Sequence, residues 1–156
     1  MDAEGPIFNF ETDFAGTLRC IPMSVRLKLD ECGVKVSLKQ WNRFPAADRQ
    51  ALLNTPCDTP NAAKGYKDLI LSLIGKHTSS APEYVTVDPS PEWSDTSRVP
   101  QRIVAYAAAL GRKAPVIDQW SKLSPLKRFT LYKLTRPNHS NDNFIPAMQE
   151  FGLTDG

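Results

Sequence analysis

The side chains with the most reactive chemistry in this sequence are three thiols and two imidazoles. They are Cys20, Cys32, Cys57, His77 and His139, and they show neither C-x2-C nor H-x3-H spacing. Because zinc sites depend on such spacings, we predict no metal site. A cysteine enzyme would pair Cys57 or Cys20 with His139 as nucleophile and base. Cys57 lies in a turn between two prolines and is the thiol we expect to be exposed, whereas Cys32 lies on an apolar helix face and is expected in the core.

A second group with possible chemistry is a basic segment at residues 112–136, which has a net charge of +6. Its charged side chains are Arg112, Lys113, Lys122, Lys127, Arg128, Lys133 and Arg136 against Asp118. Such a run usually forms a solvated helix face, although it could also meet phosphates or an acidic partner. Nucleic-acid binding is disfavoured because the whole chain carries only +2, and no aromatic platform or glycine-rich phosphate loop accompanies the run.

The polar turn at residues 136–144 follows that segment. Its asparagines, histidine and arginine could hold a small anion or a partner's backbone, or could serve as ordinary turn and capping residues. We therefore define one candidate interaction or anion site, with no catalytic residue, no metal and no cofactor predicted. Its members are Arg19, Cys57, Lys127, Arg128, Arg136, His139, Asn141 and Asn143.

The totals describe an ordinary globular protein. With 156 residues and 41% hydrophobic side chains, we expect one domain, residues 1–156, with a sizeable core. No apolar run is long enough to span a membrane, and the acidic start does not resemble a signal peptide. An odd number of irregularly spaced cysteines is typical of a reducing compartment. We therefore expect a cytoplasmic protein.

The elements that must position these residues depend on the interpretation of residues 19–33. Met23, Val25, Leu27 and Leu29 alternate with polar residues as in a strand, and a hairpin with residues 34–38 is conceivable. However, Pro22 suits the start of a helix and Gly33 suits the position after one. Gly33 comes eleven positions after Pro22, and Gly111 likewise comes eleven positions after Pro100, around an alanine-rich helical stretch.

A second match supports a repeat. Residues 40–52 and 119–131 both read Gln-Trp-x-x-(Phe/Leu)-x4-Arg-x-x-Leu. We therefore predict a helix at 22–32 and two related helical halves, at about 21–54 and 99–135. The remaining helices are expected at 37–44, 45–54, 61–76, 115–123, 125–135 and 142–151, separated by proline, glycine and capping residues.

Two segments lie outside those helices. Residues 1–20 are expected to form an extended or irregular arm, and residues 77–98 a long polar loop that Tyr84, Val85, Val87 and Trp93 attach to the body. The predicted fold class is all-α, a compact bundle of about eight short helices.

Several strings of residues resemble the nitrate reductase-associated protein family. The longest begins at Phe10-Glu11-x-Asp13-Phe14, continues through Leu18-Arg19-Cys20-Ile21-Pro22-Met23 and reaches Cys32-Gly33-Val34-Lys35. Further strings are Leu38-x-x-Trp41, Pro56-Cys57-Asp58-Thr59, Arg128-Phe129, Lys133-Leu134, Asn143-Phe144-x-Pro146-Ala147 and Glu150-Phe151-Gly152-Leu153. The resemblance implies a setting in nitrate assimilation, because the family's genes lie near those of nitrate reductase and molybdenum-cofactor synthesis, especially in cyanobacteria. It carries no activity and no catalytic residues.

Three functions follow as hypotheses. The leading one is a non-catalytic accessory protein for assimilatory nitrate reductase or its molybdenum-cofactor loading, with the reductase or cofactor-synthesis proteins as partners. The alternative is a module that binds a small anion or cofactor through the basic segment and the polar turn. A Cys/His enzyme is the further alternative.

Overall fold

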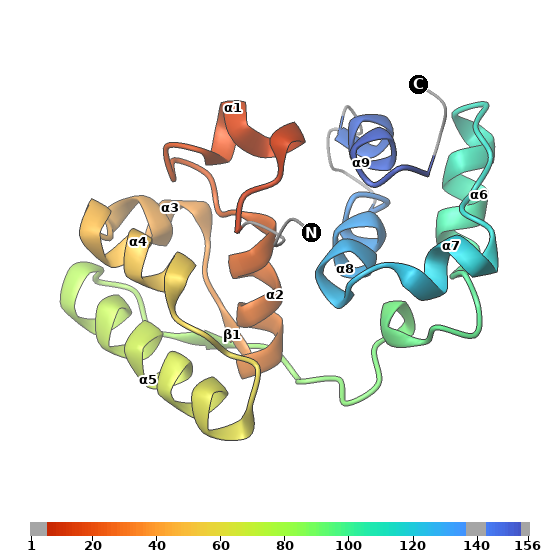
Figure 1. The fold of residues 1–156 in the computed structure, drawn as a ribbon. Coiled ribbons are helices and arrows are strands. Elements are labelled where there is room, and N and C mark those ends of the chain that lie inside the picture. The colour runs from red at the N-terminus through yellow and green to blue at the C-terminus, as the bar shows by residue number, and fades with distance from the viewer. Residues whose placement is uncertain (1–5, 137–142, 154–156) are drawn as a thin grey trace. The chain divides into compact units, whose positions relative to one another are not determined.

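The computed structural model describes residues 6–136 and 143–153, and this part of the chain is mostly helical (Figure 1). The predicted all-α class is confirmed, with one pair of two-residue strands added to it among the described residues. The chain divides into two compact units, Met1–Asp88 and Pro89–Gly156, which we call the first and second unit and describe separately. The organisation as a single domain stays a prediction.

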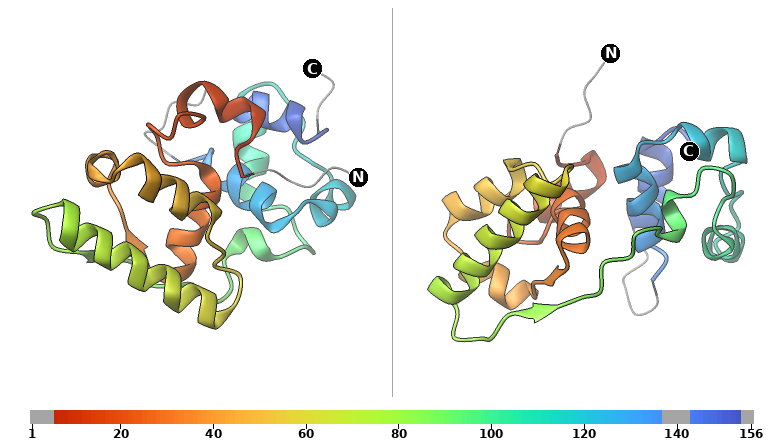
Figure 2. Two further views of the ribbon diagram at one scale, coloured as in Figure 1. Left: turned by 60° about the vertical axis from the view of Figure 1, so that its left-hand side comes forward. Right: turned by 90° about the horizontal axis from the view of Figure 1, so that it is seen from below.

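The first unit contains a short 3-10 turn, five helices and two strands among its described residues. They are η1 (Asn9–Glu11), α1 (Thr12–Ala15), α2 (Met23–Cys32), β1 (Val34–Lys35), α3 (Leu38–Arg43), α4 (Ala46–Asn54), α5 (Pro60–His77) and β2 (Glu83–Tyr84). The long helix α5 packs against α2, α3 and α4, and all views show it running along that group (Figures 1 and 2). Buried apolar side chains of these helices form the core of the unit.

The second unit contains shorter elements. Its described residues form η2 (Glu92–Ser94), α6 (Gln101–Ala109), α7 (Ile117–Lys122), α8 (Pro125–Lys133) and α9 (Phe144–Glu150). Helix α8 is central, since it contacts η2, α6 and α9. Phe129 of α8 and Phe144 of α9 are fully buried in this core.

Residues 23–32 form a helix, so the hairpin interpretation of this stretch is wrong. Gly33 follows α2 with φ 79°, and its N–H donates to the carbonyl of Leu29 at 2.9 Å. This left-handed position favours glycine because it carries no Cβ. Val34 and Lys35 do form a strand, but it pairs with Glu83 and Tyr84, not with the preceding residues.

Side-chain caps are present at three of the helix starts. Ser37 accepts the N–H of Gln40, Thr59 accepts that of Ala62, and Ser124 accepts that of Lys127, at distances of 3.1 to 3.2 Å. Each cap satisfies a backbone donor that a helix start otherwise leaves unpaired. These local contacts explain why the predicted helix starts lie close to those observed.

The N-terminal arm is not simply extended, which corrects the prediction. It folds into η1 and α1, and Glu11 at their junction is buried. The Glu11 carboxylate accepts the N–H of Phe8 at 3.0 Å and that of Met23, the first residue of α2, at 3.1 Å. A carboxylate at a helix N-terminus is favoured by the unpaired N–H groups and the helix dipole. The arm therefore caps α2.

The predicted loop at residues 77–98 is only partly attached through the side chains we expected. Trp93 packs edge-on against Phe129 with 5.6 Å between ring centroids, which confirms its role. Tyr84, Val85 and Val87 are exposed, so they are not buried anchors. Tyr84 nevertheless lies beneath Nζ of Lys67, which is 5.4 Å from its ring centre, and Cγ2 of Val87 lies close to Gly33. The segment is also attached through its backbone, which pairs with β1.

The predicted repeat corresponds to a repeated arrangement of helices. Helices α3 and α4 recur as α7 and α8, each pair equal in length and 79 residues apart, while α2 recurs as α6 78 residues later. Gly111 after α6 has φ 71°, close to that of Gly33. The matching residues Trp41 and Trp120 are both fully buried.

Candidate functional site

In the first unit, the tryptophan and the arginine of the repeated motif both donate hydrogen bonds to one backbone carbonyl. The indole Nε1 of Trp41 donates to the carbonyl of Leu18 at 2.7 Å, and Nη1 of Arg49 donates to the same carbonyl at 2.9 Å. Leu18 has φ 60°, which is uncommon for a residue with a side chain. Two donors therefore hold the chain in this conformation directly before α2.

The second unit repeats this arrangement with different carbonyls. Nε1 of Trp120 donates to the carbonyl of Asp95 at 2.8 Å, and Nε of Arg128 donates to that of Trp93 at 3.1 Å. Nη1 of Arg128 also donates to the carbonyl of Leu123. The pair holds the irregular segment that leads into α2 in the first unit and into α6 in the second.

Arg128 therefore does not lie on a solvated face, which corrects the interpretation of the basic segment at this position. The side chain is only 7% exposed, and burial lowers the pKa of its guanidinium. Two of its nitrogens already bond backbone carbonyls. Two of its five N–H donors are thus engaged, and burial limits the access of an anion to the others.

The thiol predicted to be exposed is buried. Cys57 is 5% exposed, and its Sγ donates to the carbonyl of Lys28 at 3.6 Å. Burial, together with the nearby Cys32, raises the pKa of Cys57 to about 12. Since the thiolate is the nucleophile, this cysteine is unreactive in the folded protein. Cys32 is buried as predicted, and burial raises its pKa as well.

Lys28, a half-buried residue that the sequence did not single out, lies beside this thiol. Its Nζ donates to the carbonyls of Leu53 and Thr55 at 2.8 and 2.7 Å and lies 5.6 Å from the centre of the Tyr66 ring. Burial lowers the pKa of its ammonium. The ammonium binds the carbonyl end of α4, where the helix dipole favours a cation. Lys28 therefore ties α2 to α4.

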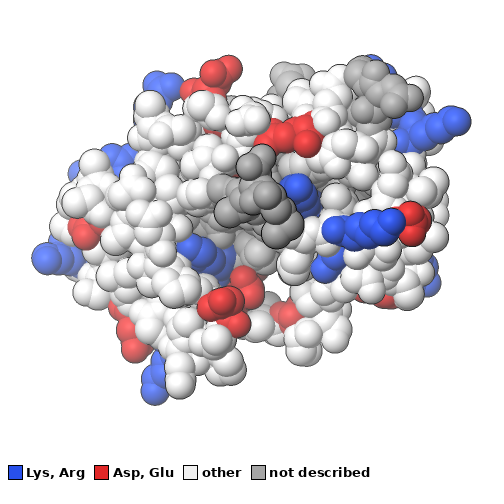
Figure 3. Space-filling model, viewed as in Figure 1, with Lys and Arg blue, Asp and Glu red and all other residues white. Residues whose placement is uncertain are grey.

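The other cations of the basic segment are more accessible. Nζ of Lys127 lies 5.4 Å from the centre of the Phe151 ring, and Lys133 has the same distance to Phe129. Arg112, Lys113 and Arg136 are exposed. On the face shown in Figure 3, lysine and arginine side chains lie over the region where Figure 1 places α7 and α8. Apart from Arg128, this segment is a basic surface of the second unit.

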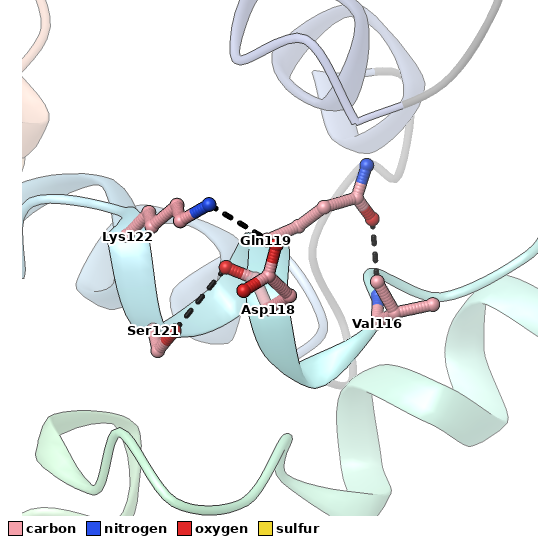
Figure 4. A network of polar contacts seen from close by, with 5 residues as sticks. All are labelled: Val116, Asp118, Gln119, Ser121 and Lys122. Carbon is pink, nitrogen blue, oxygen red and sulfur yellow. Dashed lines mark hydrogen bonds and ion pairs between the residues drawn. The ribbon is translucent and has the colours of Figure 1, made fainter.

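Helix α7 contributes a small polar network to that surface (Figure 4). Lys122 pairs with Asp118 at 3.1 Å, one helical turn away, and Gln119 accepts the N–H of Val116 at 3.0 Å. The one acidic side chain of the basic segment is thus engaged by a lysine of its own helix.

The predicted candidate site is spread over both units. Arg19, which is exposed, and the buried Cys57 belong to the first unit. Lys127, Arg128, Arg136 and Asn143 belong to the second unit, where Asn143 precedes α9 without a side-chain capping bond. His139 and Asn141 lie outside the described residues. The shared interaction or anion site stays a prediction.

Neither a metal centre nor a membrane span was found in the part of the chain that the structure describes. Within residues 6–136 and 143–153, no three His, Cys, Asp or Glu side chains are grouped in a way that could hold a metal ion. In the same residues, no helix has the length and apolar character needed to cross a membrane.

Comparison with known proteins decides the family. Residues 7–151 match the family model of the conserved nitrate reductase-associated protein. The chain belongs to this family. No curated protein and no solved structure matches it. Family membership therefore comes without a relative whose activity could be compared.

For this nitrate reductase-associated protein, many residues of the family resemblance build the fold. Glu11 caps α2, Gly33 ends it, Trp41 holds Leu18, and Cys32 and Cys57 pack in the core. None of these side chains faces solvent with a free functional group. The resemblance thus identifies the family through packing and backbone positions, and a surface for function has to be sought elsewhere.

Proposed function

We propose that this chain is a non-catalytic accessory protein of nitrate assimilation. It binds assimilatory nitrate reductase or a protein that makes or loads the molybdenum cofactor, in the cytoplasm. Membership of the nitrate reductase-associated family carries the proposal. The state of Cys57 supports the non-catalytic part, because burial and a raised pKa keep this thiol protonated at neutral pH.

The basic surface of the second unit supports a protein partner with an acidic surface. Exposed Arg112, Lys113 and Arg136 lie on one unit, and Lys122 satisfies Asp118 there. Such a charge distribution accelerates association with an oppositely charged partner and makes it depend on salt.

The test is a pull-down with the tagged full chain from cells grown on nitrate, with cells grown on ammonium as the control. We expect nitrate reductase or a molybdenum-cofactor protein to be enriched about tenfold or more in the nitrate sample and to be lost at high salt. Recovery of neither class of protein from nitrate-grown cells contradicts the proposal.

A small-anion module is the second candidate, favoured by the exposed Arg136, three residues after the end of α8. Nitrate and molybdate are the probes, and the readout is the thermal shift that each produces. If Arg136→Ala and His139→Ala leave these shifts unchanged, the anion site is not at this turn.

A further inference from the structure

The two related halves differ in what covers the loop after their first helix. In the first unit this loop forms β1, which pairs antiparallel with β2, so that Val34 lies opposite Tyr84 and Lys35 opposite Glu83. The N–H of Val85 also donates to the carbonyl of Gly33 at 3.0 Å. The loop is therefore closed by a strand from a distant part of the same unit.

The corresponding loop of the second unit, residues 111–117, has no such strand in the described chain. Counted from the glycine, Lys113 corresponds to Lys35, and the loop is one residue longer before the next helix. Within residues 6–136 and 143–153, the backbone groups of Lys113 and Ala114 make no hydrogen bond. Backbone groups left unpaired along an accessible stretch of chain are a template for strand addition.

The space around Gly33 and Gly111 gives separate evidence that the first loop is covered and the second is not. A Cβ placed on Gly33 would lie 2.9 Å from Cγ2 of Val87 and 3.1 Å from the carbonyl oxygen of Val85. A Cβ placed on Gly111 would meet no atom of the described residues within 4 Å. The covering segment therefore touches the glycine in the first unit, and the same side of the glycine in the second unit is open.

The side chains around the open loop are apolar and basic. Val116 is 60% exposed and Ile117 46% exposed, while Arg112 and Lys113 add two exposed positive charges. Val116 occupies the position before α7 where Ser37 caps α3, although valine provides no capping oxygen. In Figure 4 its side chain points away from the polar network of α7. An exposed apolar residue at a position that favours serine suits contact with a partner.

The segment that covers the first unit indicates which chemistry fits. Residues 83–88 read Glu-Tyr-Val-Thr-Val-Asp, which is acidic at both ends and apolar between. There, acidic Glu83 lies opposite basic Lys35. Arg112 and Lys113 give the open loop the same positive sign.

We propose that residues 111–117 form a docking edge for an extended segment of a partner protein. This segment carries acidic residues around an apolar centre and pairs antiparallel with Lys113, as β2 pairs with Lys35. The inference deepens the proposed function and rests on it only for the partner's role in nitrate assimilation.

The test uses the ¹⁵N-labelled full chain and a synthetic peptide of residues 82–88 with blocked ends. Saturable shifts are expected for the amides of residues 111–114, 116 and 117, since Pro115 has no amide proton. Exchange of the Lys113 amide should be slowed about tenfold or more. A peptide with lysines in place of Glu83 and Asp88 is expected to bind about tenfold more weakly. Shifts confined to residues 33–36, equal binding of both peptides, or no shift at either loop would overturn the proposal.

Matched variants separate backbone pairing from charge. Lys113→Pro removes the N–H and is expected to weaken binding about tenfold or more, whereas Lys113→Ala keeps it and costs only a few-fold. Lys64→Ala, at an exposed position of α5 in the first unit, is the control and should bind like the wild type. If Lys113→Pro fails to fold, Arg112→Glu with Lys113→Glu replaces it, and unchanged binding by that variant contradicts the proposal.

Further outcomes show whether the docking edge or the proposed function is wrong. Shifts at residues 111–117 that grow with protein concentration in the absence of peptide would show that a second copy of this chain occupies the edge. That result would contradict the proposal that the occupant is a segment of a different protein. If the pull-down recovers the reductase or a cofactor protein but the peptide does not bind, the docking edge alone is wrong. If the peptide binds and neither class of protein is recovered, the proposed function alone is wrong.

Discussion

The two units share one hydrogen-bonding arrangement, made by the same residue types, and differ in the elements built around it. In each, a buried tryptophan and an arginine donate to carbonyls of the segment that precedes α2 or its counterpart α6. The first unit adds the long helix α5 and the strand β2, whereas the second has the short helix α9 and, in the part of it that is described, no strand over residues 111–117. The comparison separates what the repeated motif needs for folding from what each copy is free to change.

The divergence also changes which groups are accessible. All three thiols belong to the first unit, and the two that lie near each other, Cys32 and Cys57, are buried. The second unit carries the basic surface and the open loop. If the proposed docking edge is correct, folding and partner binding are divided between the two copies.

Replacing the buried tryptophans is expected to have the largest effect. Trp41→Ala and Trp120→Ala should each lower the free energy of unfolding by about 3 to 5 kcal/mol, because each removes a fully buried indole and its hydrogen bond. Urea unfolding followed by circular dichroism measures this. Phenylalanine at either position keeps most of the packing and should cost about 1 to 2 kcal/mol. A marked difference between the two alanine variants would mean that the copies do not use this residue equivalently.

The arginines of the motif are expected to differ. Arg128→Ala should cost about 2 to 4 kcal/mol, since it leaves the carbonyls of Trp93 and Leu123 without their charged donor. Arg49→Ala should cost about 1 to 2 kcal/mol, because the indole of Trp41 still satisfies the carbonyl of Leu18. Thermal unfolding of both variants gives the comparison. Equal losses of stability would contradict the view that Arg128 contributes more to the fold than Arg49 does.

These arginines also show how much of the structure could be predicted from the sequence. The repeated motif located both of them, and local caps and left-handed glycines predicted most helix ends, because such signals act over a few residues. Whether Arg128 faces solvent depends on Trp93, which is 35 residues away. A run of positive charge along the chain cannot show which of its members turns inward.

Contacts between residues far apart in the sequence also explain the other differences between prediction and structure. Cys57 lies between prolines, which suggested exposure, yet its thiol contacts α2 from 29 residues away. The pairing of β1 with β2 joins segments about fifty residues apart. The docking edge was missed for a related reason: its signal is a strand present in one copy and not seen in the described part of the other, which only a three-dimensional comparison shows.

The two glycines after the first helices provide a more direct test of the closed and open loops. Gly111→Ala should cost about 1 kcal/mol, the price of a side chain at positive φ. Gly33→Ala should cost about 2 to 3 kcal/mol, because its methyl group also meets Val87 and the carbonyl of Val85. Chemical denaturation of the two variants measures the difference. Equal costs would mean that residues 83–88 do not press on Gly33 in solution.

The helix caps give the smallest expected effect and the sharpest contrast of sign. Ser37→Ala should lower the free energy of unfolding by about 1 kcal/mol, because the N–H of Gln40 loses its acceptor. Val116→Ser should raise it by about 0.5 to 1 kcal/mol, since serine can cap α7 and an exposed valine is removed. Hydrogen exchange at the first amides of α3 and α7 is the local readout. If Val116→Ser stabilises α7 and also weakens binding of the peptide of residues 82–88, then valine is kept at this position for contact with a partner and at the expense of the helix. If it stabilises α7 and leaves peptide binding unchanged, the apolar side chain at position 116 has no part in docking, and the edge depends on its backbone and charges.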